Sequence, residues 1–115
     1  YDAALRYCVQ HIDRIAICAG THNENSSLLL TQLMAENNIS PHDERIYFFL
    51  LFGMSDHISF NLAKAGYCVA KYVPYGPVSA VLPYLTRRAQ ENTSIAGQMG
   101  RELSLLTAEL QRRKK

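Results

Sequence analysis

Short apolar runs that alternate with helix-like segments constrain the fold of this chain more than any other feature. Three runs are rich in β-branched or aromatic residues and end near glycine or proline, namely IAICAG at 15–20, RIYFFLLF at 45–52 and YCVAKYV at 67–73. The first run reads as a strand that is buried on both faces. Such strands in alternation with helices are typical of parallel sheets with right-handed crossovers. The sequence therefore predicts an α/β fold of three strand–helix units.

Polar residues with capping ability mark where the helices after the first two strands begin. Ser26 or Ser27 is expected to cap the first of these helices, and Ser55 or Asp56 the second. Gly66 is expected to end the second helix, because glycine readily adopts the left-handed conformation that terminates helices.

Helices are also expected at the two ends of the chain. An amphipathic helix over 1–13 precedes the first strand, and a third helix starts at Val78. The stretch NTSIAGQMG at 92–100 interrupts it, and a final amphipathic helix follows. Its apolar face is predicted to consist of Met99, Leu103, Leu106 and Leu110.

Polar or glycine-containing loops follow each predicted strand. They are Thr21-His22-Asn23, Gly53-Met54 and the stretch 72–76. The carboxyl ends of parallel strands share one edge of the sheet, and this edge carries the functional site in parallel α/β folds. Three strands are too few to close a barrel, so the chain is either part of a (β/α)₈ barrel or a small open sheet.

Length, charge and cysteines limit the class of protein. The 115 residues suit a single unit over 1–115, and the start on Tyr1 predicts a segment of a longer protein. The net charge of +2 gives no support for a nucleic-acid partner, and the terminal QRRKK reads as a solvated helix end. Cys8, Cys18 and Cys68 show no metal-binding spacing and are expected to be buried thiols of a cytoplasmic protein. No metal site is predicted.

The segment YLTRRAQEN at 84–92 places polar side chains where a packing helix usually carries leucine. Tyr84, Arg87, Arg88 and Glu91 share one face of the predicted helix. Either this face is exposed to water with an Arg87–Glu91 pair, or the paired arginines bind a carboxylate or phosphate. The remaining apolar face is sufficient to pack the helix in both cases.

His22 likewise has two interpretations. A histidine in a loop commonly bonds to the backbone. Alternatively, His22 donates to the phosphate or ribityl group of a cofactor, with Thr21 and Asn23 beside it.

Four motifs together resemble the C-terminal portion of proline dehydrogenase. They are AGTHNE at 19–24, LFGMSD at 51–56, GYCVAKYVPYGPV at 66–78 and VLPYLTRRAQEN at 81–92. The resemblance implies a (β/α)₈ TIM-like barrel that holds FAD, with this chain supplying strands six to eight. It also implies that the last barrel helix lies over the barrel mouth.

Site residues follow from the matched motifs. The resemblance implies that Arg87 and Arg88 bind the substrate carboxylate. It assigns the walls of the proline site to Tyr84, Tyr72 and Leu51, and FAD contacts to Thr21, His22, Asn23 and Glu91. The implied reaction is oxidation of proline to 1-pyrroline-5-carboxylate by hydride transfer to FAD, with a quinone as electron acceptor. Peripheral contact with the inner membrane is compatible with a quinone partner.

Two features qualify the resemblance. Phe49 and Leu50 stand where relatives often carry a small residue and a glutamine, so the pocket near this strand is expected to differ. The family's earlier strands, which carry much of the FAD site, lie outside this chain, so the isolated chain is expected to be inactive. An alternative is a non-catalytic α/β module that self-associates, because three strands leave two unpaired edges and an uncovered apolar face.

Overall fold

The computed structural model describes the backbone of residues 1–94 and 98–114, with side chains described for 1–91, 100 and 103–114. The chain divides into two compact units, Tyr1–Val73 and Pro74–Lys115. The described residues form three strands and five helices, which confirms the α/β class.

A parallel sheet forms the centre of the first unit. Its strands β1 (Ile17–Gly20), β2 (Ile46–Leu51) and β3 (Val69–Tyr72) lie in the order β1-β2-β3. Both neighbouring pairs are parallel, as the alternation of strands and helices predicts. All three strands therefore end at the same edge, which we call the carboxyl edge.

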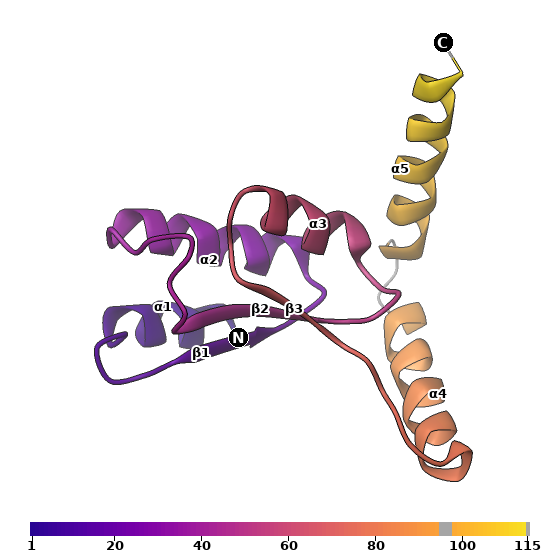
Figure 1. The fold of residues 1–115 in the computed structure, drawn as a ribbon, viewed down its shortest axis with the longest axis horizontal. Coiled ribbons are helices and arrows are strands. Elements are labelled where there is room, and N and C mark those ends of the chain that lie inside the picture. The colour runs from indigo at the N-terminus through magenta and orange to yellow at the C-terminus, as the bar shows by residue number, and fades with distance from the viewer. Residues whose placement is uncertain (95–97, 115) are drawn as a thin grey trace. The chain divides into compact units, whose positions relative to one another are not determined.

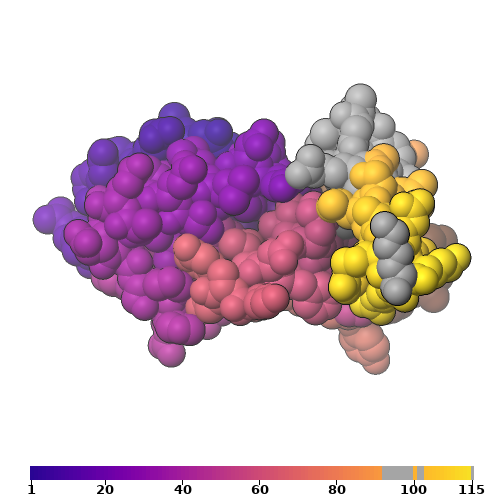
Figure 2. All heavy atoms as spheres, turned by 90° about the horizontal axis from the view of Figure 1, so that it is seen from above, coloured from indigo at the N-terminus to yellow at the C-terminus, as the bar shows by residue number. Residues whose placement is uncertain are grey.

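Three helices cover one face of this sheet. They are α1 (Asp2–Gln10), α2 (Glu24–Glu36) and α3 (Asp56–Lys64), of which α2 and α3 lie side by side above the strands (Figure 1). The first helix is shorter than the predicted 1–13. Figure 2 looks down on the layer formed by α2 and α3, which line a groove of about 270 Å³.

The core lies between these helices and the sheet. Alternate strand residues point into it, because successive side chains of a strand face opposite sides. Its largest fully buried side chains are Phe48, Leu30, Met34, Ile46, Leu50 and Val9. Burial of this apolar surface is the main force that holds the layer to the sheet.

The opposite face of the sheet remains open, which corrects two predictions. Burial along β1 alternates, with Cys18 exposed, so the expectation of a strand buried on both faces is wrong. Tyr47, the register partner of Cys18, is 40% exposed. The cysteines are free thiols, but none is fully buried, since Cys8 and Cys68 are half-buried.

Side-chain and backbone caps define the helix ends. Asn23 begins α2, and its side chain accepts from the backbone N–H groups of Asn25 and Ser26. The predicted cap at Ser26 or Ser27 is therefore wrong, because Asn23 supplies an acceptor one turn earlier. Ser55 precedes α3, as predicted, but it adopts a left-handed backbone conformation and its side chain does not cap the helix.

The second unit consists of two helices. They are α4 (Val78–Ser94), which contains Pro83, and α5 (Gln98–Arg113). Residues 95–97 of the predicted interruption and the side chain of Met99 lie outside the described part of the chain. The leucines predicted to form an apolar face on the last helix are exposed, at 60–66% for Leu103, Leu106 and Leu110. No described helix combines the length and apolar character needed to cross a membrane.

Candidate functional site

The loop after β1 is ordered by hydrogen bonds within itself. The backbone N–H of Asn23 donates to the Thr21 hydroxyl over 3.0 Å. The side-chain oxygen of Asn23 accepts from Asn25 at 2.9 Å and from Ser26 at 3.3 Å. These contacts fix the loop to the start of α2. The residue types expected to contact a cofactor therefore also build the local fold.

His22 connects this loop to the next one along the sheet. Its Nδ1 atom lies 2.9 Å from the hydroxyl of Ser55, which is 33 residues away in sequence. The sequence left two partners open for His22, the backbone or a cofactor, and the structure adds a side-chain hydroxyl. Because His22 is half-buried, the bond restricts the orientation of its ring.

Leu51 and Tyr72 lie next to each other at the carboxyl edge. They are register partners on β2 and β3, so their side chains share the open face of the sheet. Leu51 is 8% exposed, whereas Tyr72 is 42% exposed. The ring of Tyr72 lies 6.2 Å, between centroids, from that of Phe49. The structure thus brings together the two residues predicted to form part of the substrate wall.

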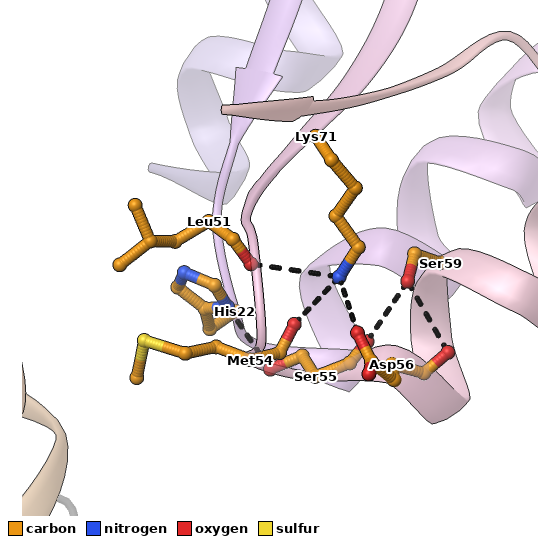
Figure 3. Close-up of polar contacts among 7 residues, drawn as sticks. All are labelled: His22, Leu51, Met54, Ser55, Asp56, Ser59 and Lys71. Carbon is orange, nitrogen blue, oxygen red and sulfur yellow. Dashed lines mark hydrogen bonds and ion pairs between the residues drawn. The ribbon is translucent and has the colours of Figure 1, made fainter. Parts of the chain in front are cut away.

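Lys71 is a site residue that the sequence reasoning missed. Its ammonium contacts the carbonyl oxygens of Met54 at 2.7 Å and Leu51 at 3.5 Å, and the carboxylate of Asp56 at 2.8 Å (Figure 3). A lysine in a strand that packs against a helix is unusual, since charged groups are seldom placed there without partners. That lone charge in YCVAKYV was the available signal.

Within the second unit, α4 brings three of its four predicted site residues together. The guanidinium of Arg88 lies 5.3 Å from the ring centroid of Tyr84, and its Nη2 atom donates to Glu91 over 2.6 Å. Glu91 thus pairs with Arg88 at the i,i+3 spacing. Arg87 is exposed. Arg88 Nε is buried and has no hydrogen-bond partner among the described residues.

The predicted site residues thus form two groups. Thr21, His22, Asn23, Leu51 and Tyr72 gather at the carboxyl edge of the first unit, and Tyr84, Arg87, Arg88 and Glu91 lie on α4 of the second. The first group offers hydroxyl, amide and imidazole groups suited to a polar cofactor chain. The second offers guanidinium donors suited to a carboxylate. A single site that combines both groups stays a prediction.

No metal-ligand cluster occurs among the described residues.

Comparison with known proteins identifies the family to which this sequence is similar. The family model described as "Proline dehydrogenase" matches residues 1–101. The chain is 46% identical over 116 aligned residues to "Proline dehydrogenase 1, mitochondrial" of Bos taurus, covering 98% of this chain and 20% of that protein. It is 45% identical to the Drosophila melanogaster protein of the same name, covering 95% of this chain and 16% of that protein. No solved structure matches the chain significantly.

The name of a third relative gives a different substrate. "Hydroxyproline dehydrogenase" of Xenopus laevis is 44% identical, with 97% of this chain and 24% of that protein covered. The chain therefore spans about a fifth of the length of these relatives. The names of the first two contradict the cytoplasmic location predicted above. Unpaired cysteines were a weak guide, because they indicate only that a compartment is not oxidising.

Proposed function

This chain belongs to the proline dehydrogenase family, and from that premise we propose that it supplies strands six to eight of a flavin-dependent (β/α)₈ barrel that oxidises proline. The three parallel strands and their covering helices are compatible with a segment of such a barrel. The open face of the sheet would then line the barrel interior, and 1–115 would be one piece of a single barrel domain.

One observation carries this proposal most strongly. The loops after β1 and β2 are joined by the bond between His22 and Ser55, at the edge where barrel enzymes hold their ligands. A lysine on β3 reaches the loop after β2 as well. This arrangement supports a built site at the carboxyl edge, rather than three independent loops.

The carboxyl edge fits a flavin in chemical terms. Thr21, His22 and Asn23 present a hydroxyl, an imidazole and an amide in an ordered loop. Such groups suit the ribityl and phosphate portions of FAD. Glu91, which holds Arg88 in the second unit, would support the flavin side of the same site. We propose these four residues as the chain's contacts with FAD.

The paired arginines of α4 would bind the carboxylate of proline. Arg88 is preorganised by its contacts with Tyr84 and Glu91, and its buried Nε–H has no partner among the described residues. Arg87 would provide further donors from the same turn. Tyr84, Tyr72 and Leu51 would enclose the apolar ring of the substrate. Fixing the carboxylate in this way orients the ring for reaction, which is a positioning effect.

The flavin, when bound, supplies the redox chemistry by accepting a hydride from the carbon beside the ring nitrogen. Loss of that hydride and of the nitrogen proton converts proline into 1-pyrroline-5-carboxylate. A quinone would take up the electrons, which is compatible with peripheral contact at a mitochondrial inner membrane. The residues of this chain bind, orient and screen the substrate, and none is assigned a proton transfer.

A second candidate applies to the chain when it is separated from the rest of a barrel. The face of the sheet that carries Cys18, Tyr47 and Phe49 borders an open hollow of about 370 Å³. Exposed apolar surface of this kind favours association. We propose that the isolated chain forms homo-oligomers and does not oxidise proline. A monomeric mass by light scattering at micromolar concentration would contradict the first statement, and proline-dependent dye reduction by the flavin-loaded chain the second.

The proposal is tested in the longer protein that carries this chain. Arg88→Met is expected to lower kcat/KM for proline by about 10²–10³-fold, mainly through KM, because a charged donor to the carboxylate is lost. Arg14→Met, at an exposed arginine of the first unit, is the matched control and should leave kcat/KM unchanged. Parallel assays with hydroxyproline separate the two substrates named among the relatives. Absence of bound flavin and of proline turnover in the unmodified protein would refute the proposal.

A further inference from the structure

The side chain of Lys71 makes polar contacts with the segment that follows β2. It lies on β3 between Ala70 and Tyr72, and its side chain is 21% exposed. The ammonium contacts Met54 O, Asp56 Oδ1 and Leu51 O. A lysine ammonium has three hydrogens, so these three acceptors match its full donor capacity. Lys71 is therefore suited to bracing the protein and poorly suited to binding an external anion.

The acceptors lie in the segment that turns from β2 into α3. Met54 N donates to Leu51 O over 3.2 Å, which closes a tight turn, and Gly53 has the positive φ of 77° that such a turn requires. Lys71 thus contacts the carbonyl of Leu51, the first residue of the turn. It also contacts Met54 and Asp56, the residues on either side of Ser55.

Ser55 itself has a strained backbone. Its φ of 51° and ψ of 43° lie in the left-handed region, which side-chain-bearing residues rarely adopt. Such conformations persist only where the surroundings impose them. Lys71 supplies one constraint by binding Met54 and Asp56, and the buried Ser59 supplies another through hydrogen bonds to the carbonyls of Ser55 and Asp56.

The strained residue is also the partner of His22. In Figure 3 the lysine, the turn, Ser55 and the imidazole form one continuous set of polar contacts. A change in the backbone at Ser55 would move its hydroxyl, and the hydroxyl is bonded to the ring. Lys71 can therefore influence His22 through the turn.

We propose that Lys71 is a positioning residue for His22, acting through the turn 51–56 and the hydroxyl of Ser55. The ammonium holds the turn in the conformation that places the hydroxyl against Nδ1 of the ring. The bond selects one ring orientation and links the tautomer of His22 to the direction of the hydroxyl. An effect of Lys71 on flavin binding through His22 rests on the proposed function, whereas the coupling between Lys71 and His22 does not.

The test measures the ¹⁵N NMR signals of the histidine rings. The chain has four histidines, so ¹⁵N-histidine labelling of the full 115-residue chain gives few ring signals, assignable through single His→Gln variants. Lys71→Met removes the ammonium but keeps a long side chain, and Lys71→Arg restores a positive charge. Ser55→Gly keeps the left-handed backbone accessible and removes the hydroxyl. Lys64→Met, at an exposed lysine in the last turn of α3, is the matched control.

Lys71→Met is expected to move the ring ¹⁵N signals of His22 towards those of Ser55→Gly, and to leave His11 and His42 unchanged. Lys71→Arg should return the His22 signals at least halfway to their original positions, and Lys64→Met should have no effect. A general loss of structure would instead move all the histidines. In that event Asp56→Asn carries the test, because it weakens one of the three contacts of Lys71 and should shift His22 in the same direction by a smaller amount.

Flavin is absent from this measurement, so failure of the chain or its parent to bind flavin would refute the proposed function and leave the coupling intact. Unchanged His22 signals in folded Lys71→Met, or in Asp56→Asn if the first variant unfolds, would overturn the positioning role.

Discussion

The two edges of the sheet are stabilised in different ways. At the amino edge, which is the edge where the strands begin, several contacts are local, although Arg45 also donates to the Ile12 carbonyl 33 residues away. Helices α2 and α3 both end there with a left-handed residue, Asn38 at φ 54° and Gly66 at φ 90°. Arg45 pairs with Asp43, two residues away. At the carboxyl edge, contacts between distant residues join the loops, as in His22 with Ser55 and Lys71 with Asp56.

Backbone hydrogen bonds explain the order at the amino edge. Gly66 N donates to Ala63 O and Tyr67 N to Leu62 O, which is the pattern of a Schellman motif. The end of α2 repeats it with Asn38 and Ile39. These motifs satisfy carbonyls that the helix leaves open. The comparison indicates that the helix ends at the amino edge form from local sequence, whereas the contacts between loops at the carboxyl edge require the assembled sheet.

The largest expected effect tests the amino edge. Gly66→Ala should lower the free energy of unfolding by about 2 kcal/mol, because a side chain at positive φ is strained. The added Cβ would also lie 3.0 Å from Cε1 of His42. Chemical denaturation measures the change. Gly100→Ala, in α5, is the control and should be neutral or stabilising, since nothing lies within 4 Å of its Cβ.

The double variant His42→Ala/Gly66→Ala separates the two causes. It removes the close contact and keeps the unfavourable φ, so most of the destabilisation should remain. Full recovery of stability in the double variant would show that the contact with His42, and not the backbone, sets the requirement for glycine.

A smaller effect is expected at the carboxyl edge. Asn23→Ala should cost about 1 kcal/mol, because two N–H groups at the start of α2 lose their acceptor. Asn23→Asp keeps an acceptor and adds a favourable charge at the helix N-terminus, so stability should be retained. The aspartate lacks the amide donor, however. Weaker flavin binding by Asn23→Asp in the parent protein, at unchanged stability, would separate the capping role from the cofactor role.

The smallest effect concerns the local ion pair of the amino edge. Hydrogen bonds from Arg45 lower the pKa of Asp43 from its ordinary value of 3.8 to about 2. The pair's contribution is therefore present above about pH 4 and is lost as the pH falls towards 2. An NMR titration of the Asp43 carboxyl carbon should give a midpoint near pH 2.

The side chain of Arg45 is 50% exposed and that of Asp43 is 15% exposed. Because the pair is local and solvent reaches it through Arg45, Asp43→Asn at neutral pH should leave the unfolding midpoint almost unchanged. A midpoint of the carboxyl titration near pH 4 would show that the pair does not persist in solution. A large loss of stability at neutral pH would contradict the contrast between the two edges.

Local pattern was sufficient to predict much of the fold. The three strands, their parallel pairing and the glycine that ends α3 follow from apolar runs, alternation and backbone preference. Prediction failed where contacts in the folded chain decide the structure. The N-cap of α2 is Asn23 and not Ser26 or Ser27, and Cys18 faces the open side of the sheet. The pairing of Glu91 with Arg88 was not determined by the sequence, because both the i,i+3 and i,i+4 spacings place residues on one helix face.

The order of the strands and helices, and the shared edge to which the polar loops belong, were determined by the sequence itself. Repeating apolar patterns and turn residues act over short distances along the chain, so they can be read without a structure. Only the tertiary structure decided that Lys71 reaches Met54 and that His22 meets Ser55. Those partners lie 17 and 33 residues apart, and their contact depends on the register of the folded sheet.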